Sequence, residues 1–327
     1  MSFRCPIHRG PDLAVNGQLL RCEHGHEIAV ERCGRFSIPR FDVLEDVEVA
    51  NNEHLYVGDS VNVRYSNFLK WLFATFRTTE LEFRKSLFSR LDLRQGSEIL
   101  VTGCGNGDDL IVLSEAFDHL ALRLYGQDIS RAMVLYSANR LQGFTNVCEL
   151  SISNACSLPY GDDRFDVVFH FGGINYFTRR GEAISEMARV VRPSGRVMII
   201  DEGVAPWLTD TDYGRMMVNN NSLWSATPPL KELPFNSVDV SLTWLLENCF
   251  YLLEFSKDLG FPNVDLDVEH LGQRGGSIRT RHSGKLEGVS PDHRQRARAQ
   301  AITHGMSDSN YLAALIEADS IEPPGKA

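Results

Sequence analysis

The fold of this chain is decided by one stretch, Ile99-Leu100-Val101-Thr102-Gly103-Cys104-Gly105-Asn106-Gly107-Asp108-Asp109. A short apolar strand runs into a G-x-G-x-G turn, and the sequence predicts a helix that begins directly afterwards, near Asp108. Glycines let a backbone turn tightly and approach a ligand closely, because no Cβ stands in the way. The N-terminus of the helix points free N–H groups and its positive dipole end at the same place. The stretch therefore predicts a ligand site at the end of a strand.

A second strand ends in a carboxylate about twenty residues further on, as nucleoside-binding folds require. Asp128 is the last residue of Leu122-Arg123-Leu124-Tyr125-Gly126-Gln127-Asp128, and it is placed to accept hydrogen bonds from a ribose diol. The third glycine of the turn comes one residue earlier than in the dinucleotide motif. Asp108 and Asp109 follow it and would repel a pyrophosphate, but they suit a cationic ligand without phosphate, such as S-adenosylmethionine. The two features together predict a nucleoside cofactor, and the alternative is an ordinary strand-to-helix turn.

From residue 98 onwards the pattern alternates between strand and helix. We expect strands at 98–102, 121–127, 147–153, 165–171 and 196–201, with helices at 108–117, 130–141 and 180–191. A long helix at 65–91 precedes them. A later helix at 240–258 is expected to lead into the last two strands, at 264–268 and 276–281. Alternation of this kind predicts an α/β fold with a doubly wound, mostly parallel seven-stranded sheet of Rossmann-like type.

The remaining segments differ in composition, which predicts the domain organisation. Residues 1–40 read as a small zinc-ribbon-like domain, 41–64 as a linker, 65–285 as the α/β domain, and 286–327 as a helical tail. The tail carries two helix signals, since Ser290-Pro291-Asp292 opens one helix, Gly305 ends it, and Ser307-Asp308 opens the next. Residues 203–238 interrupt the alternation and are expected to form either a ligand lid or a structural excursion.

Paired cysteines and histidines mark the N-terminal segment. C-x2-H is followed by C-x3-H, and this spacing predicts a closed tetrahedral zinc site with the ligands Cys5, His8, Cys22 and His26. His24 or Cys33 remains an alternative for one ligand. So short a segment cannot fold on apolar burial alone, so a metal would supply much of its folding energy. The competing interpretation is a disordered tail with scattered Cys and His.

Composition bounds the class of protein. The chain has 327 residues, a net charge of −10 and seven cysteines. The negative charge argues against a large phosphate-binding face, and the odd cysteine count does not suggest a disulfide framework. No apolar run approaches the ~18 residues of a membrane span, and the N-terminal residues lack the apolar core of a signal peptide. We expect a cytoplasmic protein, with homo-oligomerisation left open.

Several motifs together resemble the class I S-adenosylmethionine-dependent methyltransferases, over roughly residues 65–285. Within that class the chain is most similar to the C-methyltransferases of ubiquinone and menaquinone biosynthesis. The similarity is carried by the glycine turn, Leu158-Pro159-Tyr160, Phe165-Asp166-Val167-Val168, and Arg192-Pro193-Ser194-Gly195-Arg196 before a strand. The N-terminal segment resembles the zinc ribbon fused to large-subunit rRNA guanine methyltransferases, and related ribbons also occur in small-molecule methyltransferases.

The resemblance implies a set of cofactor contacts. The turn would hold the methionine part of S-adenosylmethionine, Asp128 the ribose, and the remaining residues the adenine and the transfer site. The implied set is Gly103, Cys104, Gly105, Asn106, Gly107, Asp108, Asp128, Ile129, Met133, Asn154, Ala155 and Phe171. Asn154 stands where the family usually has Asp, and its carbonyl can still accept a hydrogen bond. Val101 stands where the family usually has an acid, which Asp108 or Asp109 is a candidate to replace.

Methyl transfer needs alignment and sometimes a base. His170 is the candidate base, because it falls near the expected site and titrates near neutral pH; a structural role is the alternative. Asn175, Tyr176 and Glu202 are weaker candidates for contact with the acceptor.

Three functions compete. The first is methyl transfer to a small molecule, with no nucleic-acid or membrane partner, bound beneath the 203–238 insertion. Its Trp207, Met216, Met217 and Trp224 would form an apolar wall, and Asn219, Asn220 and Asn221 would offer polar contacts. The second is rRNA or tRNA base methylation, which the basic residues Arg274, Arg279, Arg281, Lys285, Arg294, Arg296 and Arg298 favour. The third is a cofactor-binding protein without transfer activity, for which Val101 is the main argument.

Overall fold

A computed structural model of the chain describes residues 3–16, 19–41, 61–260, 264–268, 271, 277–283 and 290–319. The chain divides into two units, Met1–Phe261 and Pro262–Ala327. Most of the predicted linker 41–64, and the basic residues Arg274 and Lys285, lie outside the described residues.

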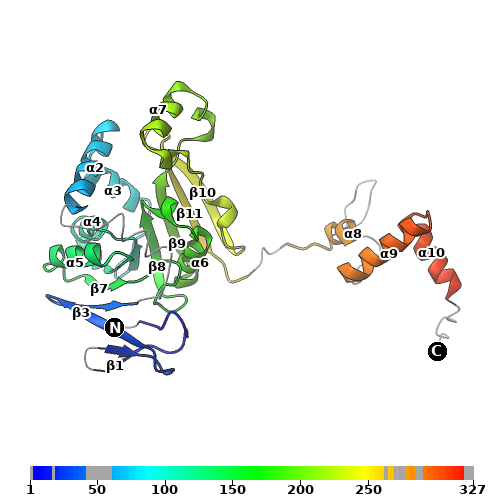
Figure 1. The fold of residues 1–327 in the computed structure, drawn as a ribbon, viewed down its shortest axis with the longest axis horizontal. Helices are drawn as coiled ribbons and strands as arrows, with labels where there is room; N and C mark the ends of the chain where they lie inside the picture. Colours follow the sequence, from blue (N-terminus) through cyan, green and yellow to red (C-terminus); the bar gives the residue numbers. More distant parts are fainter. Residues whose placement is uncertain are drawn as a thin grey trace. The chain divides into compact units, whose positions relative to one another are not determined.

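The first unit is built on one mixed sheet (Figure 1). Its strand order is β1-β2-β3-β4-β7-β6-β5-β8-β9-β11-β10. The strands are β1 (Ala14–Asn16), β2 (Leu19–Arg21), β3 (Glu27–Cys33), β4 (Phe36–Arg40), β5 (Glu98–Thr102), β6 (Arg123–Asp128), β7 (Val147–Ile152), β8 (Phe165–Phe171), β9 (Val191–Glu202), β10 (Ser237–Leu245) and β11 (Phe250–Lys257).

Seven of these strands make the predicted Rossmann-like sheet. Strands β7, β6, β5, β8 and β9 are parallel neighbours, and β11 runs antiparallel to β9 and β10. The central strands read as continuous apolar runs because helices cover both of their faces. The prediction of a doubly wound, mostly parallel seven-stranded sheet is confirmed, and the N-terminal strands β1–β4 extend its edge through a parallel β4–β7 pair.

Helices cover the two faces of the sheet unequally (Figure 1). On one face, α2 to α5 pack over a core that includes Leu72, Leu87, Leu113 and Val134, and α6 packs on the other face over a separate core. The helices of this unit are α2 (Val61–Thr75), α3 (Glu80–Phe88), α4 (Asp108–Ala116), α5 (Arg131–Arg140), α6 (Arg180–Val190) and α7 (Asp212–Asn220). Short 3-10 helices lie at Asp118–Leu120, Ile174–Tyr176, Pro206–Leu208, Ser222–Ser225 and Leu230–Glu232.

The predicted helix 65–91 is two helices. α2 ends at Thr75, Arg77 takes a positive φ of 54°, and Thr79 begins α3 with a capping box. The Thr79 side chain accepts from the Glu82 N–H, and the Glu82 carboxylate accepts from the Thr79 N–H. This reciprocal cap satisfies backbone N–H donors at the start of a helix, which would have no need of it within a continuous helix. The T-x-x-E motif therefore indicates that a new helix begins here.

The prediction of a helix at 240–258, followed by the last two strands, is wrong. Residues 240–258 form the hairpin β10–β11 instead of a helix. β11 is buried along nearly its whole length, and a short continuous apolar run cannot be told from a buried helix by periodicity. Consecutive positive φ values at Leu246, Glu247 and Asn248 make the turn.

The strands predicted after that hairpin are also wrong. Residues 264–268 form no strand, and α8 (Ile278–Ser283) is a helix where a strand was expected, with Gly276 outside the described residues. The hairpin β10–β11 already supplies the last two strands of the seven, in place of these residues.

The second unit contains the predicted tail helices. α9 (Pro291–Thr303) begins at Ser290, whose hydroxyl accepts from the His293 N–H at 3.3 Å. Gly305 has a φ of +63°, and Ser307 caps α10 (Asp308–Ala318). The predicted starts of both helices and the predicted end of the first at Gly305 are confirmed, because they depend only on local capping chemistry.

We predict that Phe169→Ala destabilises the sheet core by about 3–5 kcal/mol, since it removes a fully buried ring. Phe169 is 0% exposed and its ring lies 4.8 Å from that of Phe88. Urea unfolding followed by circular dichroism measures the loss. Phe235, which is 66% exposed, is the control, and Phe235→Ala should change stability by less than about 0.5 kcal/mol. Equal effects of the two substitutions would contradict the assigned core.

Candidate functional site

The glycine turn lies at the carboxyl end of β5, where parallel sheets bind ligands. Gly103 and Gly107 have φ values of +60° and +85°, which side chains rarely adopt. A Cβ on Gly103 would lie 3.0 Å from Cε1 of His170, and one on Gly107 would lie 2.5 Å from Oγ of Ser137. The turn therefore packs closely on its own supports and leaves no room for larger residues at these two positions.

The carboxylate of Asp128 ties this turn to the next helix. One oxygen accepts from the Gly105 N–H at 2.8 Å, and the other accepts from the Ser130 N–H at 2.8 Å. Burial raises the pKa of Asp128, while the backbone N–H groups lower it. Each oxygen keeps a further lone pair, so the carboxylate can accept hydrogen bonds from a ligand without releasing the turn.

The residues expected around the adenine gather beside the turn. Met133 lies in the first turn of α5, and its Cε is 3.7 Å from a Cβ built on Gly105. Asn154 follows β7, which pairs with β6, and its Oδ1 accepts from the Cys156 N–H at 2.9 Å. Ile129 is half-buried between Asp128 and the α5 cap. The fold thus brings two chain segments, near residues 130 and 154, to one side of the turn.

Other residues of the expected cofactor set support the turn from inside. Cys104 is buried, and burial raises the pKa of its thiol. The backbone carbonyl of Asn106 accepts from the Arg140 guanidinium at 2.7 Å. Ala155 and Phe171 are buried at the ends of their segments, and the Phe171 ring lies 5.8 Å from that of Phe83.

Both acids after the turn already have arginine partners. Asp108 pairs with Arg140 at 2.7 Å, on the side that faces α5. Asp109 is buried and pairs with Arg84, which is only 2% exposed. Neither carboxylate stands in for the acid that is usual at Val101, and Val101 is itself fully buried. The expectation that Asp108 or Asp109 replaces that acid therefore has no support in the geometry.

His170 lies under the glycine turn. It is 1% exposed, and its Nδ1 lies 3.0 Å from the carbonyl oxygen of Thr102 and 3.1 Å from its hydroxyl. Burial lowers the pKa of His170, opposed by the charge of Asp201 and by backbone hydrogen bonds. The imidazole is therefore neutral near pH 7, and it packs directly against Gly103.

A pair of acids ends β9. The Asp201 carboxylate is fully buried and accepts from the N–H groups of Asn175 and Glu202, both at 2.8 Å. Glu202 is 8% exposed, and burial followed by the charge of Asp201 raises its pKa well above the usual range. Tyr176 is close enough for both acids to raise its pKa, after burial. The sequence indicated these residues only weakly, because nothing local shows that the two acids would be buried together.

The predicted insertion forms one wall of a cavity of about 480 Å³. Its other walls come from the end of α2 and the β10–β11 turn. The lining residues are Thr75, Phe76, Leu208, Thr211, Tyr213, Met217, Glu247 and Asn248. The wall is mostly apolar, with a few polar groups, as small-molecule sites are.

Only part of the predicted wall faces this cavity. Met217 lines it, whereas Trp207 and Met216 are each 63% exposed, and Trp224 is buried beneath Trp71. The Asn221 side chain caps a 3-10 helix by accepting from the Leu223 N–H.

The Cys/His residues of the N-terminal segment converge. Sγ of Cys5 lies 3.4 Å from Nδ1 of His8 and 3.2 Å from Nδ1 of His26, and Sγ of Cys22 lies 3.4 Å from Nδ1 of His8. A tetrahedral zinc ion with ordinary bond lengths separates such S and N atoms by about 3.6 Å. The ligand atoms of Cys5, His8 and Cys22 all lie within 4.8 Å of one another, so these three residues could hold a metal ion. His26 contacts the group through Cys5.

The two alternative ligands are placed elsewhere. The His24 ring stacks on that of His8 at 4.6 Å and its Nδ1 lies 3.8 Å from the Glu23 carboxylate. The Cys33 thiol donates to Oδ1 of Asn139 at 3.3 Å, on α5. The backbone N–H of His26 donates to Sγ of Cys22 at 3.3 Å. This bond stabilises the turn between Cys22 and His26.

Comparison with known proteins shows what the central region is similar to. Residues 100–199 match the family model described as a methyltransferase domain. This part of the chain is similar to S-adenosylmethionine-dependent methyltransferases. The match spans the glycine turn, Asp128 and the strands up to β9, which are the elements that build the site.

Relatives match over the same region. The chain is 33% identical over 120 residues to a demethylmenaquinone methyltransferase of Oceanobacillus iheyensis, covering 36% of this chain and 50% of that protein. It is 30% identical over 135 residues to the 27-O-demethylrifamycin SV methyltransferase of Amycolatopsis mediterranei, covering 41% and 48%. The chain therefore spans about half the length of these curated relatives.

A solved structure shares the fold. Phosphoethanolamine N-methyltransferase 2 of Haemonchus contortus, in complex with S-adenosyl-L-methionine, aligns with a TM-score of 0.50 at 13% identity, covering 68% of this chain and 62% of that one. At this identity the likeness concerns the fold alone. Among the described residues, no helix combines the length and the apolar character that a membrane span requires.

We predict that Glu202 makes the protein less stable as the pH rises. Below the ordinary value of 4.5 both states hold the proton. As the pH rises from there through the raised pKa of the folded state, only the unfolded state releases it, so stability falls. The Gln side chain of Glu202→Gln cannot titrate. As the pH rises above 4.5, the melting temperature of this variant should therefore increase relative to that of the wild type.

Thermal melts of both proteins between about pH 4 and about pH 9 test this linkage. Glu115→Gln, at an exposed position on α4, is the control and should follow the wild-type profile. A difference between Glu202→Gln and the wild type that is the same at every pH would show that Glu202 does not titrate in this way.

Proposed function

We propose that the chain transfers a methyl group from S-adenosylmethionine to a small-molecule acceptor. The observation that carries this proposal is the Asp128 carboxylate, which holds the Gly105 and Ser130 N–H groups and keeps lone pairs for a ribose. The cofactor supplies the reactive methyl group when bound. The residues proposed to hold it are Gly103, Cys104, Gly105, Asn106, Gly107, Asp108, Asp128, Ile129, Met133, Asn154, Ala155 and Phe171.

The protein's part in this reaction is alignment and exclusion of water. The Gly103–Gly107 turn brings backbone N–H groups close to a ligand, and Asp128 orients the ribose. Arg84 and Arg140 neutralise the two acids that follow the turn. Each of these arginines is therefore paired with an acid, so neither one presents an unpaired positive charge to the sulfonium group of the ligand.

Cofactor affinity tests the first half of the proposal. Asp128→Ala should weaken binding of S-adenosylhomocysteine by about 1–3 kcal/mol, because ribose hydroxyls lose their acceptor and two backbone N–H groups lose theirs. Isothermal titration calorimetry measures the change. Asp166→Ala, at the other end of the sheet, is the control and should bind normally. Wild-type protein that does not bind the product at all would refute the proposal.

The cavity beneath the 203–238 insertion supports a small acceptor. Its volume of about 480 Å³ and its apolar wall suit a drug-sized molecule. Relatives are named for acting on demethylmenaquinone and 27-O-demethylrifamycin SV. The net charge of −10 disfavours a nucleic acid, and Arg279 of the expected basic cluster is paired with Asp267 at 2.8 Å.

Two groups are candidates to take the proton of the acceptor. His170 remains the candidate from sequence, and its near-complete burial against Gly103 favours a role as floor of the cofactor site. Glu202 ends β9, one strand beyond Phe171, and burial and then the charge of Asp201 raise its pKa well above the usual range. A base must lie within reach of the acceptor, and Glu202 follows the strand end from which the 203–238 insertion begins, so it is the better placed candidate.

Transfer to a fractionated cell extract tests the second half. Protein is incubated with methyl-labelled S-adenosylmethionine, and label should appear in the small-molecule fraction. Met217→Trp, which fills the cavity, should abolish that label while product binding by calorimetry is kept. Label in RNA would favour the rRNA or tRNA alternative. Binding without label in any fraction would favour the cofactor-binding protein without activity.

We also propose that Cys5, His8, Cys22 and His26 hold one structural zinc ion. The S···N distances of 3.2–3.4 Å support a single tetrahedral centre. All four ligands come from the protein, which leaves no open position for a reacting molecule, so the metal would serve folding and not catalysis.

Elemental analysis of protein purified without chelator should find about one zinc per chain. Cys22→Ser should lower this content, because one thiolate ligand is lost. Cys148→Ser, at an exposed cysteine outside the cluster, is the matched control and should keep it. Wild-type protein without zinc, whose Cys5 and Cys22 react freely with a thiol reagent, would contradict the site.

A further inference from the structure

The N-terminal strands are joined to the half of the sheet that carries the proposed cofactor site. β4 pairs in parallel with β7, with Arg40 opposite Ile152. The backbone N–H of Phe41 donates to the Ile152 carbonyl at 2.8 Å. β7 leads directly into Asn154, so the N-terminal strands lie against the segment expected to bind the adenine.

The β3–β4 hairpin holds both ends of α5. At the start of the helix, the Arg131 guanidinium donates two hydrogen bonds to the Glu31 carboxylate, at 2.7 and 2.6 Å. At the end of the helix, Arg35 donates to the carbonyls of Leu141 and Val147 at 3.4 and 3.0 Å. A helix leaves its last carbonyls without partners. Leu141 is the C-cap residue of α5, so Arg35 gives its carbonyl a partner, whereas Val147 begins β7. The hairpin therefore contacts both ends of the helix that begins beside Asp128.

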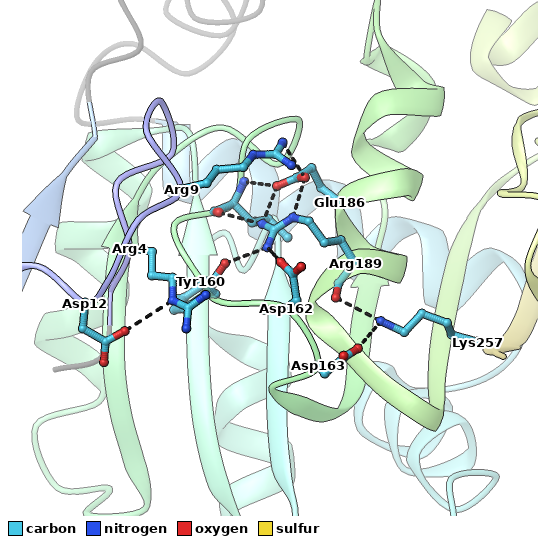
Figure 2. Close-up of polar contacts among 10 residues, drawn as sticks. Arg4, Arg9, Asp12, Tyr160, Asp162, Asp163, Glu186, Arg189 and Lys257 are labelled. Atoms are coloured by element: carbon cyan, nitrogen blue, oxygen red, sulfur yellow. Dashed lines mark hydrogen bonds and ion pairs between the residues drawn. The ribbon is translucent and has the colours of Figure 1, made fainter. Parts of the chain in front are cut away.

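The segment around the first two proposed metal ligands contacts both the loop after β7 and α6, and Figure 2 shows Arg9 of this segment beside Glu186 of α6. Arg4 and Arg9 flank Cys5 and His8 in the chain. The Arg4 N–H donates to the Pro159 carbonyl at 3.0 Å. The Arg9 guanidinium lies 3.2 Å from the Glu186 carboxylate, which is 8% exposed.

Glu186 is the point where these contacts meet. Figure 2 shows it between Arg9 and Arg189, and Arg189 donates to it from two nitrogens at 2.7 Å each. Its Oε2 also accepts from the Leu158 N–H at 2.8 Å. Leu158 lies four positions after Asn154, in the same loop. The buried Glu186 carboxylate therefore connects the N-terminal segment, through Arg9, to the loop that contains Asn154.

We propose that the N-terminal segment 3–41, folded by the zinc ion proposed above, is a positioning element that holds α5 and the 154–160 loop in the geometry that binds the cofactor. Glu31, Arg35 and Arg9 are the positioning residues, and none of them needs to touch the cofactor. The inference rests on the proposed function, because it requires that this half of the sheet binds S-adenosylmethionine or its product. If the inference holds, loss of the metal weakens cofactor binding, and cofactor binding strengthens metal binding by the same factor.

Variants that keep the metal give the first test. Glu31→Ala and Arg35→Ala should each weaken S-adenosylhomocysteine binding roughly two- to fivefold, the scale of a partly exposed polar contact. The exchanged pair Glu31→Arg with Arg131→Glu should restore affinity. Arg94→Ala breaks an exposed pair with Asp92 before β5, far along the chain from α5, and should have no effect. Zinc content is measured for every variant.

Removal of the metal gives the second test. Wild-type protein is treated with a zinc chelator, and product binding is measured by calorimetry together with hydrogen exchange. Affinity should fall roughly 5- to 150-fold, the usual range of coupling between sites. Exchange should rise in α5 and residues 154–160, while β11 stays protected. Return of zinc should reverse both changes.

The outcomes separate the two proposals. Wild-type protein that never binds the product refutes the proposed function. Zinc-free protein that binds the product with unchanged affinity, or zinc-retaining variants at Glu31 and Arg35 that bind as tightly as the wild type, refute the positioning role alone. If chelation unfolds the whole chain, the zinc-retaining variants and the exchanged pair decide the question.

Discussion

The Asp128 carboxylate is the contact on which the candidate cofactor site depends. It joins three pieces of backbone, namely the end of β6, the Gly105 amide in the turn after β5, and the Ser130 amide that begins α5. Backbone amides are obligatory donors that must be satisfied when buried. Because Asp128 accepts from two of them, it holds the turn and the start of α5 together. The residues that flank the turn and the helix start are positioned by the same contacts.

Arginine pairs extend that constraint outwards. Arg84 holds the second residue of α4 to α3, and Arg140 holds the first residue of α4 to α5. Removing one partner from a buried pair leaves an uncompensated charge, which costs several kcal/mol. The acids after the glycine turn therefore belong to the framework of the site. A buried carboxylate has the same effect at Glu186 on α6, where it connects the N-terminal segment to the loop after β7.

The strand, turn and helix that carry the candidate site were predicted where their signals are local. Asp128 and the glycines could be assigned because a strand, a turn and a helix N-terminus follow one another in the sequence, and their geometry is set by sterics and backbone hydrogen bonds. The cofactor contacts themselves remain predictions. The partners of Asp108, Asp109 and Glu202 could not be assigned, since they depend on burial and on residues tens of positions away, such as Arg84 for Asp109.

The sequence by itself determined the parallel sheet, the positions of its first five strands, the caps of the tail helices, and the spacing of the Cys/His cluster. Each of these follows from short-range patterns. Only the tertiary structure decided that β10 and β11 close the sheet, because a buried run such as Phe250–Phe255 has no period that distinguishes strand from helix. It also decided that the N-terminal strands join β7, since strand pairing across more than a hundred residues depends on which sheet edge is left unpaired.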